Sequence, residues 1–264
     1  MRTYKVILSL GLVVAVAFGA YAAFMYVYTD HMFAPVVLMA KPDNAAPASV
    51  WTAPDTVRFI HRVNTPTRAR AKDKTFDGFE VDVWQQNGQL LAAHDPAQAL
   101  KNIPLAAIFA AVKEPAKKSW WLDLKQDLTP DTLQQILNTA RDYQIPNENL
   151  LFETSEGPTA RLIKNKNLGL LLTLPEGFET DGDEPQKRSE LNARVLSLWK
   201  EYQPAAVAAS FGKYAYLKAY FPNMPKAIYY SSTVRPSLKK PFMAAHMQQD
   251  PAVKIFMTDE YTYL

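Results

Sequence analysis

The chain has 264 residues, of which 48% are apolar and 21% are charged, and it contains no cysteine. This composition excludes a disordered chain and a disulfide-stapled miniprotein, and the missing thiols exclude zinc–thiolate sites and iron–sulfur clusters. The formal net charge is only +3, so we expect no nucleic-acid partner.

The chain begins with an apolar segment. Val6–Tyr28 has no charged side chain and, as a helix, is long enough to cross a hydrocarbon layer of about 30 Å. Arg2 and Lys5 precede it, so the distribution of positive charge predicts a cytoplasmic N-terminus. We therefore predict that residues 1–28 form a single-pass anchor in the inner (cell) membrane, with the working domain on the periplasmic, extracytoplasmic side. A cleaved signal peptide is the alternative, because Ala20-Tyr21-Ala22 has the small-x-small form of a cleavage site.

Residues 29–54 are rich in proline and alanine, which predicts an extended spacer before one domain at 55–264. Short apolar runs in that domain predict eight strands, at Val57–His61, Phe79–Trp84, Trp120–Leu124, Leu150–Glu153, Gly169–Thr173, Ala205–Ser210, Ala227–Tyr230 and Val253–Met257. Segments with helical spacing separate most of these runs, such as the one after Thr129-Pro130, a typical helix start. The alternation predicts a (β/α)₈ or TIM barrel, with an open doubly wound sheet as the alternative.

One strand more than the barrel needs is also predicted. Gln86-Asn87-Gly88 carries the Asn-Gly signal of a tight hairpin turn. We therefore expect Gln89–His94 to return as a hairpin strand beside the second predicted strand. The acidic stretch Pro175–Pro185 predicts an exposed loop.

Charged side chains interrupt two predicted strands. Glu80 and Asp82 are two residues apart and so share one face of their strand, and Asp123 and Lys125 repeat this spacing on the next. Buried charges need partners, because an unpaired one costs several kcal/mol. A divalent cation would balance the three carboxylates, and purely oxygen ligands favour Mg²⁺ or Ca²⁺ over zinc.

The expected charges define what the site would bind. Three carboxylates, one divalent ion and the cations Arg62 and Lys125 leave one net positive charge. Such a site suits a singly charged phosphodiester.

Two of the four histidines end predicted strands. His61 ends the first, and His94 ends the hairpin strand, so both would lie at the carboxyl-terminal mouth of a barrel, where active sites of this architecture occur. Two imidazoles can serve as general base and general acid. His31 and His246 have no such context, since the first lies in the spacer and the second on a helix face.

Each feature alone also has a structural explanation. A histidine at a strand end often only supports the fold, a Glu-x-Asp pair often faces solvent, and an Asp-x-Lys pair can be a salt bridge. Their joint occurrence at consecutive strand ends indicates a functional site.

The order His61-Arg62, Glu80-x-Asp82, His94-Asp95 and Asp123-x-Lys125 resembles that of the glycerophosphodiester phosphodiesterases, within the phospholipase-C-like phosphodiesterase barrels. The ending Ile255-Phe256-Met257-Thr258-Asp259 is similar to the last strand of that family. The resemblance implies a metal held by Glu80, Asp82 and Asp123, acid–base catalysis by His61 and His94, and phosphate binding by Arg62 and Lys125.

Several positions depart from this pattern. Val63 replaces the usual glycine, and the Pro-Glu-Asn-Thr segment that normally follows is missing, so the first loop is short. His61-Arg62-Val63-Asn64 and Asp123-Leu124-Lys125 are more similar to the sphingomyelinase D-like phospholipases and to menorin-type domains. Ile228-Tyr229-Tyr230-Ser231 resembles the seventh strand of the former but lacks its tryptophan.

We therefore expect a metal-dependent phosphodiesterase that cleaves a glycerophosphodiester or a phospholipid head-group phosphodiester. The alternative is a non-catalytic barrel that binds phospholipid or phosphate in an envelope or assembly role. A third hypothesis, Schiff-base chemistry at Lys125, is disfavoured because nearby carboxylates would keep that lysine charged. Four aromatic side chains could line a head-group pocket or simply pack in the core: Trp84, Phe211, Tyr229 and Tyr230.

Overall fold

A computed structural model of the chain describes residues 16–21, 23–24, 56–175, 185–230 and 240–259. The strands are β1 Val57–Ile60, β2 Gly78–Gln86, β3 Gln89–Ala92, β4 Ser119–Leu124, β5 Leu150–Thr154, β6 Gly169–Thr173, β7 Ala206–Ser210, β8 Lys226–Tyr230 and β9 Val253–Thr258. The helices are α2 Pro66–Lys72, α3 Pro96–Ala99, α4 Leu105–Ala110, α5 Pro130–Asp142, α6 Pro158–Asn165, α7 Pro185–Tyr202, α8 Tyr214–Tyr220 and α9 Lys240–Gln248. Short 3₁₀ turns are η1 Pro115–Lys117, η2 Asn147–Asn149 and η3 Phe211–Lys213.

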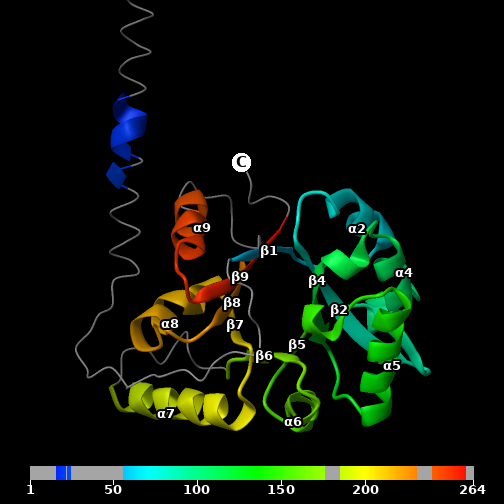
Figure 1. The fold of residues 1–264 in the computed structure, drawn as a ribbon. Coiled ribbons are helices and arrows are strands. Elements are labelled where there is room, and N and C mark those ends of the chain that lie inside the picture. Colours follow the sequence, from blue (N-terminus) through cyan, green and yellow to red (C-terminus); the bar gives the residue numbers. More distant parts are fainter. Residues whose placement is uncertain (1–15, 22, 25–55, 176–184, 231–239, 260–264) are drawn as a thin grey trace, which may run out of the picture.

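Eight parallel strands close into a barrel. Neighbouring strands follow the order β1-β9-β8-β7-β6-β5-β4-β2, and pairing of β1 with β2 completes the ring. Helices α2, α4 and α5 cover one side of it, and α7, α8 and α9 cover the opposite side (Figure 1). The structure confirms the predicted (β/α)₈ barrel and excludes the open sheet.

The predicted hairpin strand is also present. β3 pairs antiparallel with the last residues of β2, outside the ring of parallel strands. Asn87 and Gly88 make the turn with φ values of 52° and 75°, the left-handed conformation that this turn requires. Because β3 runs back along the end of β2, the segment that follows it returns to the carboxyl-terminal mouth.

The inside of the barrel combines large and small side chains. Phe59 and Trp121 are fully buried in one cluster with alanines of β7 and β8. Gly78 on β2 has a steric role, since a Cβ there would lie 2.4 Å from the Phe59 ring. Small residues therefore make room for the two large rings.

The outer faces of the strands pack against the helices. Two apolar clusters separate the strands from the helices, one under α4, α5 and α6 and one under α7, α8 and α9. Helix α5 begins as predicted: the Thr129 hydroxyl accepts a hydrogen bond from the Thr132 N–H, and Pro130 occupies the first turn.

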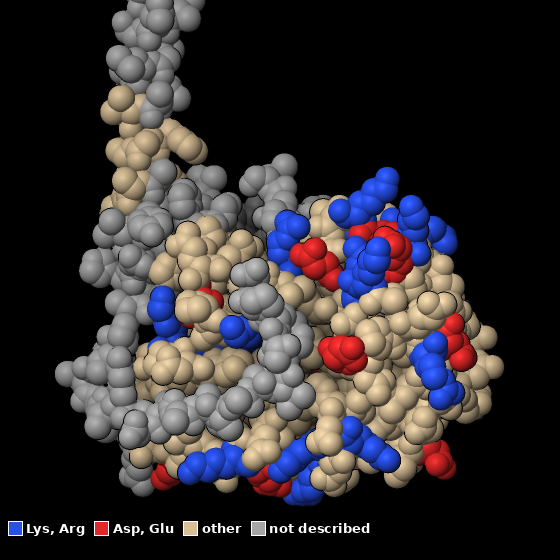
Figure 2. Space-filling view, viewed as in Figure 1, with Lys and Arg blue, Asp and Glu red and all other residues tan. Residues whose placement is uncertain are grey.

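Charges of both signs mix on the surface near α2 (Figure 2). Among the ion pairs, Lys118 with Asp73 at 3.5 Å is partly buried, whereas Lys117 with Glu114 at 2.6 Å is exposed. Exposed pairs of this kind contribute little to stability.

The predicted anchor and spacer lie mostly outside the described residues, as does most of the predicted loop Pro175–Pro185. The described part of the anchor, residues 16–21 and 23–24, is helical. Among the residues described, the structure contains no helix with both the length and the apolar character needed to cross a membrane.

Candidate active site

Acidic side chains from three adjacent strands line a cavity at the carboxyl end of the barrel. The strand register pairs Asp82 of β2 with Asp123 of β4, and Asp123 with Glu153 of β5, so these three side chains lie at one level. Glu80 precedes Asp82 by two residues and lies one level deeper on the same face. The structure thus brings together the three side chains predicted to hold a metal, and adds Glu153.

Glu80, Asp82 and Asp123 are close enough to share one ion. One oxygen atom from each lies within 4.8 Å of the other two. Glu80 and Asp82 are almost fully buried, and Glu80 Oε1 has no hydrogen-bond partner among the described residues. An unsatisfied buried carboxylate oxygen is costly, and a hard divalent cation such as Mg²⁺ or Ca²⁺ would satisfy it. The donor set therefore fits the predicted metal.

The titration behaviour of these acids reflects their crowding. Burial raises the pKa of Glu80 well above its usual range, and repulsion from Asp82 and Asp123 raises it further. Burial also raises the pKa of Asp123, although the attraction of Lys125 opposes this. A bound cation would stabilise the ionised forms, so cation binding and deprotonation are coupled at this site.

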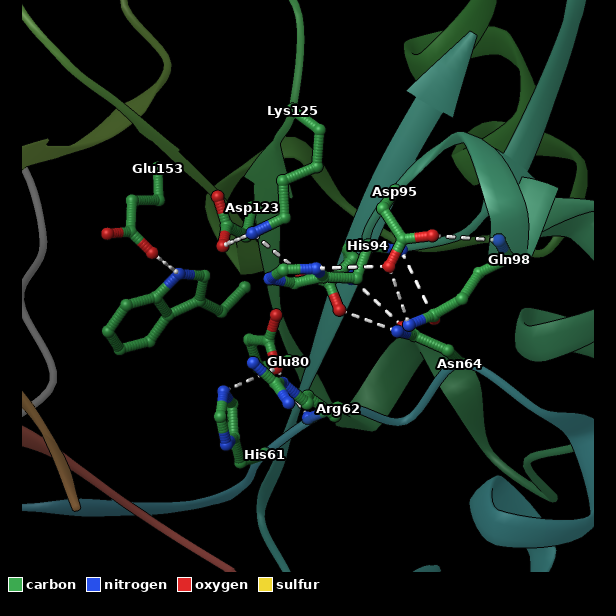
Figure 3. A network of polar contacts seen from close by, with 12 residues as sticks. His61, Arg62, Asn64, Glu80, His94, Asp95, Gln98, Asp123, Lys125 and Glu153 are labelled. Atoms are coloured by element: carbon green, nitrogen blue, oxygen red, sulfur yellow. Dashed lines mark hydrogen bonds and ion pairs between the residues drawn. The ribbon is translucent and has the colours of Figure 1, made fainter. Parts of the chain in front are cut away.

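Lys125 contacts two of the acids, and Figure 3 shows its amine beside Asp123. Its Nζ atom is 2.8 Å from Asp82 Oδ1 and also donates a hydrogen bond to Asp123 Oδ2. Burial lowers the pKa of Lys125, but attraction to Asp123 and Asp82 outweighs burial and raises the pKa above its usual value. The lysine therefore stays protonated, which suits anion binding and argues against the Schiff-base hypothesis.

His61 is oriented from the last strand. Its Nδ1 atom lies 2.8 Å from Asp259 Oδ1, and its Nε2 atom lies 3.8 Å from Glu80 Oε2. A carboxylate beside Nδ1 favours the tautomer with the proton on that nitrogen, which leaves the Nε2 lone pair facing the cavity. In this tautomer, Nε2 could accept a proton from a group bound in the cavity. Asp259 had a sequence signal only as part of a similar strand ending, and its pairing with His61 was not predicted.

His94 reaches the same cavity from the segment after β3. Its Nδ1 atom is 3.6 Å from Asp95 Oδ2, and the Asp95 side chain caps α3 by accepting a hydrogen bond from the Gln98 N–H at 2.9 Å. That N–H is the main reason why the pKa of Asp95 is lowered. The His94 side chain is 39% exposed, so it can exchange protons with solvent.

Arg62 contributes its backbone as well as its side chain. Its N–H donates to Glu80 Oε2 at 2.5 Å, and its φ of 56° is in the left-handed region. A residue other than glycine costs about 1 kcal/mol there, and such strain often occurs at functional sites. The side chain lines the cavity, where it can meet an anion.

Two further polar residues were not predicted to belong to the site. Glu153 accepts hydrogen bonds from Trp121 Nε1 at 2.8 Å and from Thr173 Oγ1 at 3.0 Å. Burial, with repulsion from Asp123, raises its pKa to about 8. Asn64 hydrogen-bonds to Asp82. An acid at the end of the next strand was a sequence signal for Glu153, whereas Asn64 had no signal beyond its place in the short first loop.

The cavity has a volume of about 230 Å³, which suits a compact polar group. Its walls include all seven predicted site residues together with Glu153, Tyr229 and Met257. Of the four aromatic residues considered, Tyr229 lines the cavity, whereas Tyr230, Phe211 and Trp84 pack in apolar clusters.

No protein-family model matches the chain, and no curated protein sequence matches it. Solved structures with a similar fold include a glycerophosphodiester phosphodiesterase from Parabacteroides distasonis, with 14% identity over 78% of this chain and 94% of that chain and a TM-score of 0.45. An N-(5'-phosphoribosyl)anthranilate isomerase from Pyrococcus furiosus has 9% identity over 77% of this chain and 88% of that chain, with a TM-score of 0.49. An orotidine 5'-monophosphate decarboxylase from Sulfolobus solfataricus has 10% identity over 79% and 90%, with a TM-score of 0.47. These names span several reaction types, so the function of this chain must be argued from its own site.

Proposed function

We propose that this chain is a metal-dependent phosphodiesterase that cleaves a glycerophosphodiester or a phospholipid head-group phosphodiester. One observation carries the proposal: a single cavity combines the carboxylate cluster of Glu80, Asp82 and Asp123 with two imidazoles and two cationic side chains. A structural role for any one of these groups would not require the others beside it.

The charges of the cavity suit a phosphodiester. Glu80, Asp82 and Asp123 would hold a divalent cation, which when bound would stabilise negative charge on the phosphate oxygens. Lys125 and Arg62 would bind those oxygens and orient the phosphorus. In the metal-free protein, the raised pKa of Glu153 keeps this residue largely neutral at pH 7, so Glu153 adds little to the negative charge of Glu80, Asp82 and Asp123.

The histidines would move the protons. The Nε2 atom of His61 would accept a proton from the attacking hydroxyl or water, or donate one to the leaving alkoxide, with Asp259 stabilising the charged ring. His94 would perform the opposite transfer. If a hydroxyl of the substrate attacks, a cyclic phosphate is the first product; if water attacks, the diester is hydrolysed directly.

We propose further that the N-terminal segment anchors the domain to the inner membrane, on the extracytoplasmic side. The described part of this segment is helical, with Val16, Phe18 and Phe24 exposed. An anchor would hold the cavity near lipid-derived substrates. Fractionation of cells that express the protein with a tag at either end would test this. Tagged protein that is found in the soluble fraction, or that washing releases from the membranes, would contradict membrane attachment.

The test of activity uses the full-length chain, purified in detergent, with glycerophosphodiesters and phospholipids as substrates. We expect turnover with Mg²⁺ or Ca²⁺, its loss with chelator, and its loss in His61→Ala. His246→Ala is the matched control, since this histidine lies on α9 and pairs with Lys218 outside the cavity. Equal turnover in wild type and His61→Ala would overturn the proposal. Phosphodiester binding without turnover over a broad metal and pH screen would favour the non-catalytic alternative.

A further inference from the structure

The short loop between β1 and α2 contacts both acidic residues of β2. Arg62 N–H donates to the side chain of Glu80, and Val63 N–H donates to the Glu80 carbonyl at 2.8 Å. The Asn64 side chain contacts both the carboxylate and the backbone N–H of Asp82. The loop therefore orients both β2 members of the carboxylate cluster from one side.

Asn64 makes two complementary hydrogen bonds with Asp82. Its Nδ2 atom donates to Asp82 Oδ2 at 2.5 Å, and its Oδ1 atom accepts from the Asp82 N–H at 3.0 Å. The opposite amide orientation would set an oxygen against the carboxylate and an NH₂ group against an N–H, so only one orientation satisfies both contacts. One side chain thus fixes the backbone and the carboxylate of Asp82 together.

The rest of the loop holds Asn64 in place. Val63 is fully buried in the apolar cluster under α4, α5 and α6. Thr65 caps α2 by accepting a hydrogen bond from the Arg68 N–H at 3.2 Å. Arg68 Nη2 donates to the His61 carbonyl at 3.0 Å. A buried neighbour on one side and a helix cap on the other leave the Asn64 backbone little freedom.

We infer that Asn64 is a positioning residue for the bound cation. Because Asn64 engages Oδ2 of Asp82, the orientation of the carboxylate is fixed, with Oδ1 at 2.8 Å from Lys125 Nζ. The inference rests on the proposed function, since it requires that the cluster binds a metal. It predicts that loss of Asn64 weakens metal binding through Asp82 while the chemistry of the histidines is retained.

The experiment measures Mn²⁺ binding to the full-length protein by electron paramagnetic resonance, which does not depend on turnover. Asn64→Leu keeps the approximate volume and removes both hydrogen bonds, and we expect it to weaken Mn²⁺ binding about 10- to 100-fold. With saturating Mn²⁺, we expect its kcat to return to within about threefold of wild type. Asn64→Ala provides a second variant if leucine disturbs folding.

Thr65→Ala is the matched control. It removes the cap of α2 from the neighbouring position, so it should lower the melting temperature and leave the Mn²⁺ affinity unchanged. The inference is overturned if folded Asn64→Leu and Asn64→Ala bind Mn²⁺ as tightly as wild type, or if Thr65→Ala weakens binding to the same extent. If wild type itself binds no Mn²⁺, the proposed metal dependence fails together with this inference.

Discussion

The two halves of the barrel differ in what they place at its carboxyl end. β2, β4 and β5 place Asp82, Asp123 and Glu153 at one level of the mouth, while β7 and β8 end near Ser210 and Tyr229. The first half carries the carboxylates that could bind a cation, and the second carries neutral side chains above small alanines. The charged half therefore carries most of the candidate site, whereas the alanines of the other half make room for the large interior rings.

The largest effect should follow from a change in the charged half. Glu80→Gln removes a buried carboxylate of the cluster, so we expect phosphodiester turnover to fall about 10³-fold or more. Without metal, the same variant should be more stable than wild type, because a buried charge crowded by Asp82 and Asp123 has gone. Turnover assays and thermal unfolding with and without Mg²⁺ would measure both effects.

Glu148→Gln is the control for that variant, because Glu148 is exposed on η2 and outside the cavity. It should match wild type in both measurements. Unchanged turnover in Glu80→Gln would contradict the proposal that the carboxylates of the charged half are needed for activity.

A change in the packed interior should instead affect stability. Trp121→Ala empties the space of a fully buried ring and leaves Glu153 without one donor, so we expect a loss of about 3–5 kcal/mol in the free energy of unfolding. Trp84→Ala, at a half-buried position on β2, should cost less than half as much. Denaturant unfolding would compare the two variants, and equal losses would contradict the role given to Trp121.

The orientation of His61 can be tested from the last strand. Asp259→Asn keeps the size of the side chain but removes the negative charge beside Nδ1, so we expect kcat to fall about 10²-fold with little change in KM. Asp250→Asn is the control, because Asp250 bonds to Tyr214 on α8. If both variants kept wild-type kcat, Asp259 would have only a structural role.

Of these variants, Glu153→Gln should have the smallest effect on activity at pH 7. The Glu153 pKa of about 8 exceeds the ordinary value of 4.5, so the folded protein holds a proton that the unfolded chain releases. The stability of metal-free wild type should therefore fall, relative to Glu153→Gln, as the pH rises from 4.5 to 8, by at most about 1.4 kcal/mol per pH unit, and then level off. Denaturant unfolding would measure the free energy of unfolding of both proteins as a function of pH. If this free energy changed with pH equally in both, Glu153 would not be the titrating group.

Much of the fold follows from local patterns. The eight barrel strands occur where apolar runs predicted them, with boundaries differing by one or two residues, and β3 follows the Asn87-Gly88 turn. Period-two spacing placed Glu80 beside Asp82, and Asp123 beside Lys125, on shared faces. These predictions succeed because strand periodicity and turn conformation depend on nearby residues.

The contacts that orient the site could not be predicted in the same way. Asp259 reaches His61 only because β9 pairs with β1, which closes the barrel. Asn64 reaches Asp82 because β1 also pairs with β2, and Glu153 joins the acids through the register of β4 and β5. Of these three contacts, only that of Glu153 had a local signal, an acid at the end of a predicted strand.

Local sequence encodes the strand pattern, the hairpin turn and the types of charged side chain available to a site, because each depends on spacing along the chain. Closure of the barrel sets which oxygen of each carboxylate is engaged and which nitrogen of His61 faces the cavity, and it brings Glu153 beside the other acids. Those features depend on which strands become neighbours when the barrel closes, and on the low-dielectric interior that closure creates.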